Sequence, residues 1–110
     1  MTEQAAVFYA NERAGVLSKI GNHYRFIYDS AYVNRHDSLP ISVSIPLQSD
    51  PYEFDSFPPF FDGLLPEGWL LELESTKYKI NRGDKFALLL AVGENCIGAV
   101  HIEPMEPIDD

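Results

Sequence analysis

The acidic side chains between residues 67 and 74 are the first candidates for chemistry, because paired carboxylates can act as general acid and general base. They are Glu67, Glu72 and Glu74. Acids along one amphipathic helix usually form its solvated face, so this pattern favours an ordinary helix surface over a catalytic pair. Cys96 could be a nucleophile, but a lone cysteine is more often a small buried hydrophobe. We therefore expect no catalytic residue.

Metal and nucleotide sites are not indicated either. The three histidines, His23, His36 and His101, are scattered, and with one cysteine they match no recognised zinc spacing. The glycines form neither a GxGxxG turn nor a GxxxxGK[ST] phosphate loop. The kinase motifs HRDxxxxN and DFG are absent, and no serine lies in a GxSxG elbow. We expect a protein without a cofactor or enzymatic activity of its own.

Length and composition predict one soluble globular domain over residues 1–110. The chain is 45% hydrophobic, too apolar for disorder, and no apolar run approaches the roughly 18–20 residues that cross a bilayer. A formal charge of -9 repels phosphate backbones, so direct binding to nucleic acid is not expected. With one cysteine and no secretory signal at the N-terminus, the sequence fits a reducing cytoplasm.

The apolar pattern predicts an α+β fold, with two or three helices packed on a small, mostly antiparallel sheet. The strands are expected near residues 6–9, 14–20, 23–28, 41–47 and 98–102. Gly21-Asn22, between two β-rich runs, predicts a tight hairpin because Gly readily adopts positive φ. Residues 41–47 alternate apolar and small polar side chains without a break, which predicts a strand that ends or becomes an edge at Pro46.

The second half of the chain predicts helices. After a proline-containing loop over 48–59, one helix is expected from about Pro66 to Tyr78 and another from Asp84 to Gly93. The second is apolar nearly all round and should be buried. An acidic tail follows from about residue 104. The predicted core consists of Val7, Val16, Phe26, Val43, Ile45, Phe60, Leu64, Leu73, Phe86, Leu89, Leu90 and Val100.

The stretch FFDGLLPEGWLLE, residues 60–72, holds the single tryptophan, directly after a Pro-Glu-Gly break. The side chains here offer more apolar area than a short loop and one helical turn need for themselves. Tryptophan is strongly enriched among binding hot spots, so Trp69 could enter a cleft on a partner. Trp69 also begins a helical i, i+4, i+7 spacing with Leu73 and Thr76, so it could instead belong to the domain's own core. Both interpretations stay open.

Four segments, in order, resemble the N-terminal subdomain of HipA-type serine/threonine kinases. They are LPISVSIPL at 39–47, FFDGLLPEG at 60–68, GDKFALL at 83–89 and GENCIGAV at 93–100. The corresponding family patterns are approximately PLSLSLPL, FFxNLLPEG, GDxFALL and GxDCxGAL. The run from Asn11 to Leu17 also resembles the family's opening N-G-x-x-V-G-x-L hairpin, with Glu12 in place of the usual Gly.

The resemblance implies a function as well as a fold. A complete HipA-type kinase continues into the part that carries the ATP site and catalytic aspartates, whereas this sequence begins at Met1 and stops at Asp110. The arrangement resembles the HipS family, the small antitoxins of tripartite HipBST toxin–antitoxin systems. By this resemblance, the chain would bind and inhibit a HipT-like kinase toxin, which phosphorylates an aminoacyl-tRNA synthetase. It would meet a HipB-like DNA-binding protein through the complex.

We expect the partner-binding residues at the Pro66 break. They are Trp69, Leu65, Glu67, Gly68 and Asp62. The acids could meet basic groups around an ATP site. Two other functions stay in play: a stabilising N-terminal domain or fragment of a larger HipA-type kinase, and an acidic decoy that occupies the nucleic-acid site of the DNA-binding partner.

Overall fold

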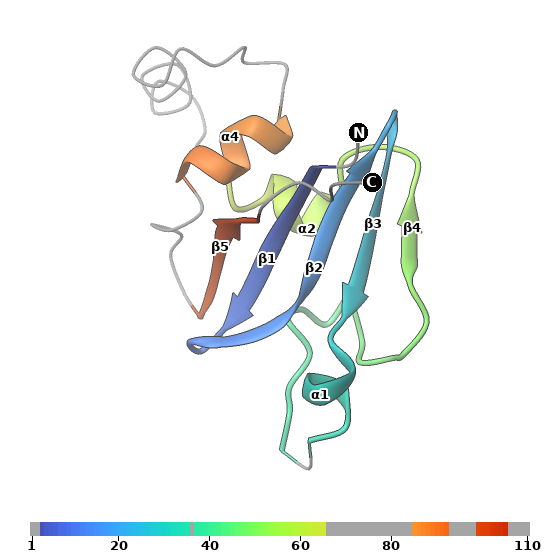
Figure 1. The fold of residues 1–110 in the computed structure, drawn as a ribbon, viewed down its shortest axis with the longest axis vertical. Coiled ribbons are helices and arrows are strands. Elements are labelled where there is room, and N and C mark those ends of the chain that lie inside the picture. The colour runs from blue at the N-terminus through green and yellow to red at the C-terminus, as the bar shows by residue number, and fades with distance from the viewer. Residues whose placement is uncertain (1–2, 36, 66–84, 93–98, 106–110) are drawn as a thin grey trace.

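A five-stranded antiparallel sheet forms the centre of the molecule (Figure 1). The structure, a computed structural model, describes residues 3–35, 37–65, 85–92 and 99–105. The strands are β1 (Glu3–Tyr9), β2 (Glu12–Ile20), β3 (His23–Tyr28), β4 (Tyr52–Phe54) and β5 (Val100–Pro104). The helices are α1 (Ser30–Val33), α2 (Pro59–Asp62) and α4 (Lys85–Val92). The strand order is β4-β3-β2-β1-β5, which confirms the predicted α+β class.

Two tight hairpins join the first three strands. Between β1 and β2, Ala10 and Asn11 have φ values of 50° and 70°, as a type I′ turn requires at its two central residues. Between β2 and β3, Gly21 has a φ of 61°, which confirms the hairpin expected there. Gly15 is needed for a different reason: a Cβ at that position would lie 2.4 Å from the carbonyl oxygen of Ile27.

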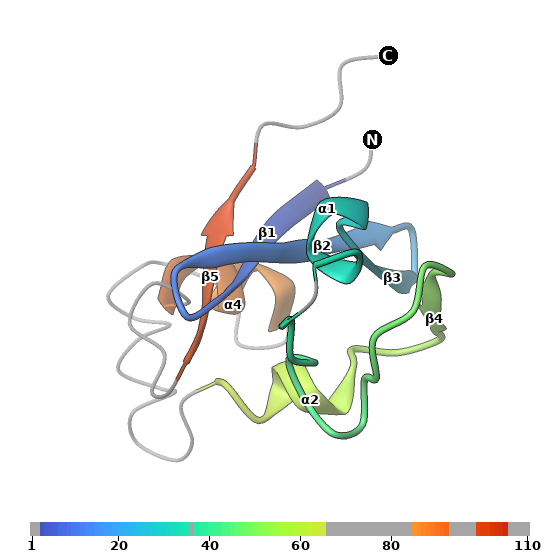
Figure 2. The same cartoon turned by 90° about the horizontal axis from the view of Figure 1, so that it is seen from below.

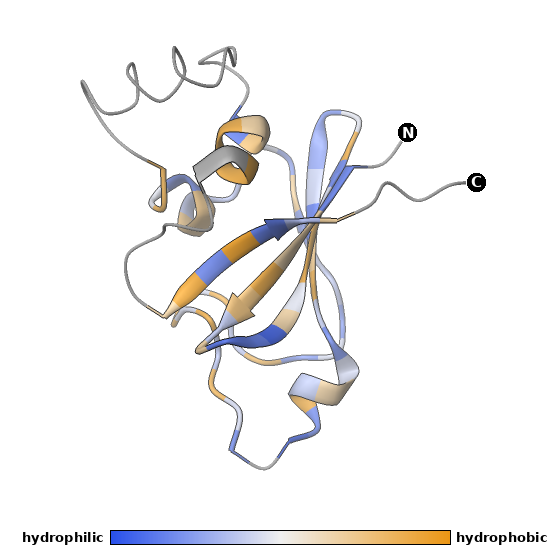
Figure 3. Cartoon of the chain, turned by 60° about the vertical axis from the view of Figure 1, so that its left-hand side comes forward, coloured by the Kyte–Doolittle hydropathy of each residue, from blue (hydrophilic) through white to orange (hydrophobic). Residues whose placement is uncertain are grey.

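The core lies between the sheet and the helices. In Figure 2, α2 and α4 lie on the same side of the sheet. The strands alternate between a buried apolar face and a more polar face, as Figure 3 shows along β5. The largest fully buried side chains include those of Phe26, Phe61, Phe86, Leu17, Leu88, Leu89, Ile102 and Val7.

Most of the predicted core is confirmed where the structure describes it. Val7, Phe26, Ile45, Phe86, Leu89 and Val100 are buried, and Phe60, Leu64 and Leu90 are partly buried against them. The core predictions for Val16 and Val43 are wrong: Val16 pairs with Ile27 on the more polar face of the sheet and is only half-buried, and Val43 is exposed. The prediction for Leu73 lies outside the described residues.

The predicted strand over 41–47 is wrong. Ser42 and Ile45 form an isolated antiparallel bridge, with the amide of Ile45 donating to the carbonyl of Ser42 over 3.0 Å, so the chain turns back on itself. Ile41 and Ile45 are buried on either side of the turn, whereas Val43 at its tip is 97% exposed. The alternation in the sequence is therefore not an alternation of faces, because Val43 is exposed while Ile41 and Ile45 are buried.

The strand that pairs with β3 comes from the segment that was expected to be a loop. The short strand β4 pairs Tyr52 with Phe26, and Phe54 with Tyr24. The final strand is two residues later than predicted, and α4 confirms the expected apolar helix. The helix expected from Pro66 lies outside the described residues. No helix within the described part of the chain is long and apolar enough to cross a membrane.

Candidate partner-binding surface

The predicted binding site begins at α2, which is anchored in the core. Pro59 is the first residue of this helix, where its missing N–H costs no hydrogen bond. Phe61 is fully buried, and its ring centroid lies 5.9 Å from that of Phe26 and 5.2 Å from that of Phe60. This packing fixes the start of the FFDGLLPEG segment against the sheet.

The structure describes two of the five predicted binding residues. Leu65 is 8% exposed and belongs to the core, so its side chain offers little area to a partner. Asp62 is exposed, and its carboxylate lies 3.0 Å from the ammonium of Lys85. This ion pair joins α2 to the start of α4. The predictions for Trp69, Glu67 and Gly68 lie outside the described residues.

A second surface, which the sequence did not predict, is the turn around Val43. We call residues 39–46 the clamped turn, because hydroxyl groups of tyrosines from three other elements hold its backbone. The hydroxyl of Tyr28 accepts a hydrogen bond from the amide of Ile41 over 3.0 Å and donates one to the carbonyl of Ile45. One buried phenol therefore joins the two arms of the turn.

Two further tyrosines fix the ends of the clamped turn. The hydroxyl of Tyr32, in α1, donates to the carbonyl of Leu39 over 2.6 Å. That of Tyr52, in β4, donates to the carbonyl of Pro46, also over 2.6 Å. Pro40 and Pro46 have no backbone N–H, so neither can donate a backbone hydrogen bond to a neighbouring strand.

The protonation state of the tyrosines suits this role. Burial raises the pKa of Tyr28 to about 12, although the hydrogen bond from the Ile41 amide acts in the opposite direction. Desolvation also raises the pKa values of Tyr32 and Tyr52. All three hydroxyls therefore keep their protons, and can donate to the carbonyl groups of the turn, at neutral pH.

The clamped turn displays apolar side chains to solvent. Val43 is 97% exposed and Leu39 is 58% exposed. Beside Val43, the hydroxyls of Ser42 and Ser44 lie 2.9 Å apart. The sequence did carry one signal for this structure, because prolines at 40 and 46 bracket the segment and proline is disfavoured inside a strand. The tyrosine contacts, in contrast, depend on the tertiary fold.

A shallow recess of about 170 Å³ adjoins the clamped turn. Its lining consists of Tyr9, Ala10, Glu12, Tyr32, Arg35, Asp37, Ser38 and Leu39. Arg35 pairs with Glu12 and also with Asp37, the latter over 3.2 Å. Because two carboxylates face one guanidinium, these three side chains together carry a net negative charge. It offers a place for contact with a partner and shows no nucleophile–base pair among its lining residues.

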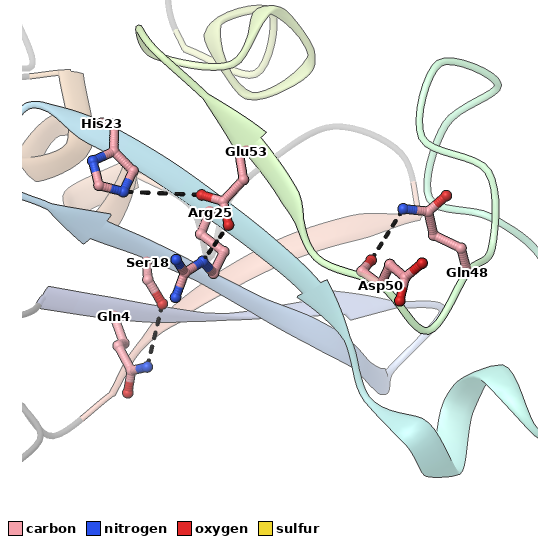
Figure 4. A network of polar contacts seen from close by, with 7 residues as sticks. All are labelled: Gln4, Ser18, His23, Arg25, Gln48, Asp50 and Glu53. Carbon is pink, nitrogen blue, oxygen red and sulfur yellow. Dashed lines mark hydrogen bonds and ion pairs between the residues drawn. The ribbon is translucent and has the colours of Figure 1, made fainter.

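The more polar face of the sheet carries a network of polar contacts (Figure 4). Glu53, in β4, accepts from the Nε of Arg25 over 2.7 Å and lies 3.9 Å from His23. Gln4 donates to Ser18, which is buried, over 3.2 Å. These contacts join neighbouring strands. The ion pair of Glu53 with Arg25 is exposed, and such pairs contribute only about 0–1 kcal/mol each to stability.

Comparison with known proteins gives one consistent result. The family model of the HipA N-terminal domain matches residues 5–103. A solved structure described as the N-terminal domain of HipA toxin superposes with a TM-score of 0.73 and 31% sequence identity, covering 96% of this chain and 95% of that one. The resemblance noted from the sequence motifs is thus confirmed in both sequence and fold.

Two relatives show this domain in different settings. An uncharacterised protein of Haemophilus influenzae is 33% identical over 103 residues, which cover 94% of this chain and 93% of that protein. A candidate kinase of Sinorhizobium fredii, Y4mE, is 33% identical over 86 residues, which cover 76% of this chain but 20% of that protein. The domain therefore occurs both in a short protein and as a minor part of a long one.

Proposed function

Because the chain belongs to the HipA N-terminal domain family, we propose that it is a HipS-type antitoxin, which binds and inhibits a HipT-like serine/threonine kinase toxin. The observation that carries the proposal is the extent of the match, since family-like sequence occupies residues 5–103. This domain is not the catalytic kinase part of a HipA-type protein. An effect of this chain on phosphorylation would thus come from binding to a kinase.

Trp69 is the proposed main anchor, with Asp62, Glu67 and Gly68 beside it. Of these residues the structure describes Asp62, which is exposed and pairs with Lys85 over 3.0 Å. Leu65 is too well buried to contribute much contact area. Truncating an aromatic hot spot typically costs ~2–4 kcal/mol, or roughly thirty- to a thousandfold in affinity.

The test compares Trp69→Ala with the wild type in two measurements: thermal unfolding of the free protein, and rescue of cells that express the kinase. An interface tryptophan leaves the melting temperature nearly unchanged while rescue fails. If Trp69 belongs to the core, the substitution lowers the melting temperature as well, because replacing a buried tryptophan with alanine costs ~3–5 kcal/mol in the free energy of unfolding. Normal rescue by a well-folded variant would eliminate this anchor and leave Glu67 as the next candidate.

The partners themselves can be identified by copurification from the cells that encode the chain, followed by mass measurement of the complex. We expect a HipT-like kinase together with a HipB-like DNA-binding protein. The isolated chain should neither bind ATP nor transfer phosphate, and micromolar ATP binding in a calorimetric titration would contradict this. Capture of the DNA-binding protein without the kinase would instead favour the acidic decoy.

A second candidate function is that of a stabilising domain within, or derived from, a larger HipA-type kinase. The alignment with Y4mE favours it, since there the similar region is part of a much longer chain. Co-expression separates the two functions. A stabilising domain raises the activity of the kinase, whereas an inhibitor lowers it.

A further inference from the structure

The clamped turn exposes apolar area without an evident structural use. Three large hydrophobic side chains are exposed among the described residues, and two of them, Val43 and Leu39, lie in this turn. The third, Ile27, is 38% exposed on the more polar face of the sheet. From Ser38 to Gln48 no residue is charged, although 23% of the chain is. Within this uncharged segment Ile41 and Ile45 are buried, so the apolar area that it offers to a partner is that of Val43 and Leu39.

The turn is also held in one conformation before any partner binds. Tyr28 joins its two arms, and Tyr32 and Tyr52 fix its ends. Ordering flexible loops is one of the main costs of association, and a loop that is already ordered avoids it. Val43 is β-branched and loses little side-chain freedom on burial. The turn therefore has the rigidity and small apolar tip expected of an anchor.

The charges around the turn indicate the kind of surface that it fits. Before the turn, Asp37 and Glu12 both pair with Arg35, which leaves one net negative charge, and the exposed Asp50 lies after the turn. A second copy of this chain would bring like charges together, in a molecule whose net charge is already -9. A different protein that surrounds an apolar pocket with basic side chains would be complementary.

We propose that the clamped turn is a second anchor, which inserts Val43 and Leu39 into an apolar pocket with a basic rim on the kinase partner. The inference rests on the proposed function, because it takes the kinase as the partner. It is supported by position: Figure 2 shows the segment around the turn on the same side of the sheet as α2, and Ile41 and Ile45 share one core cluster with Phe61 and Leu65. One partner could thus cover both surfaces.

The experiment measures the affinity of the full chain for the kinase obtained by copurification. Val43→Asp places a charge at the apolar tip, and we expect binding to weaken about thirtyfold or more while the melting temperature stays unchanged. The control is Asn22→Asp in the β2–β3 hairpin, at the other end of the sheet (Figure 1). It adds the same charge at an exposed position and should leave the affinity within about twofold of the wild type.

The outcomes separate this inference from the proposed function. Tight binding by the wild type and equal binding by Val43→Asp would overturn the second anchor and leave the antitoxin function standing. A wild-type chain that does not bind the kinase would overturn both. Sedimentation equilibrium provides the remaining check: a dimer of the free wild type that Val43→Asp dissociates would show that the turn binds a second copy, which also overturns the inference.

Discussion

The β2–β3 hairpin turn and the clamped turn are both exposed, yet they are stabilised in opposite ways. In the hairpin, Gly21 at a φ of 61° supplies the conformation locally, and the flanking strands pair directly. In the clamped turn, the backbone bonds to phenols from three other elements, including Tyr28, 17 residues away from Ile45. A turn whose conformation is set by its own residues can be predicted from sequence, whereas a turn that depends on tertiary hydrogen bonds cannot.

The largest expected effect distinguishes the clamped turn from the strand that the sequence predicted. Ile45 is 2% exposed, so Ile45→Ala should lower the free energy of unfolding by about 2–5 kcal/mol through lost burial and a residual cavity. Val43→Ala, at a position 97% exposed, should change it by less than about 0.5 kcal/mol. Urea unfolding of both variants provides the measurement.

The pair of variants serves as its own control. A strand over 41–47 would direct both side chains to one face, so the two substitutions would then have similar costs. Equal losses of stability would contradict the turn and restore the strand.

The contrast also explains how far the sequence could predict the fold. The first three strands were predicted from β-rich runs separated by turn residues such as Gly21-Asn22, and α4 from an apolar run between Asp84 and Gly93. The strand β4 was missed because three residues, Tyr52 to Phe54, are too few to show a period, and prolines on either side suggested a loop. Its place is decided by pairing with β3, a contact between distant residues.

The sequence likewise predicted only part of the candidate site. The Pro66 break was predicted from the motifs; of the residues predicted there, the structure describes Asp62 and Leu65. The burial of Leu65 could not be inferred, because FFDGLL contains several apolar residues and only packing decides which of them face the core. The exposure of Val43 was missed because its neighbours Ile41 and Ile45 are both apolar and both buried.

The next largest expected loss of stability tests the hydrogen bonds between Tyr28 and the clamped turn. Tyr28→Phe keeps the ring but removes the hydroxyl, which leaves the amide of Ile41 and the carbonyl of Ile45 without this partner in a buried setting. We expect a loss of about 1–3 kcal/mol in the free energy of unfolding. Amide hydrogen exchange at Ile41 should become faster than in the wild type, and unchanged exchange would argue against the clamp.

The same tyrosine makes stability dependent on alkaline pH. Its pKa is about 12 in the folded protein against 10.0 for the free side chain, so the folded state holds the proton more tightly than the unfolded state does. The stabilisation is complete below pH 10 and is lost as the pH rises from 10 towards 12, by roughly 2–3 kcal/mol in total.

Urea unfolding at pH 9, 10 and 11 measures this loss. Because Tyr28→Phe has no proton to lose at this position, its stability should fall less steeply over that range than that of the wild type. Tyr32 and Tyr52 are present in both proteins, and their charges also raise the pKa of Tyr28, so the difference between the two profiles reports the Tyr28 hydroxyl together with its coupling to them. Parallel pH profiles would show that the Tyr28 hydroxyl is not the buried, donating group described here.

The smallest effect is expected at the hairpin turn, where the conformation is local. Nothing lies within 4 Å of the position that a Cβ on Gly21 would occupy, so Gly21→Ala introduces backbone strain at a φ of 61° without a steric clash. The loss in the free energy of unfolding should be about 1 kcal/mol. Gly21→Asn should recover part of it, because asparagine tolerates the left-handed region better than alanine does. Urea unfolding of the two variants tests whether this one residue determines the turn. Equal losses of stability for alanine and asparagine would mean that contacts beyond the backbone conformation hold the hairpin. The hairpin turn would then no longer differ from the clamped turn in this respect.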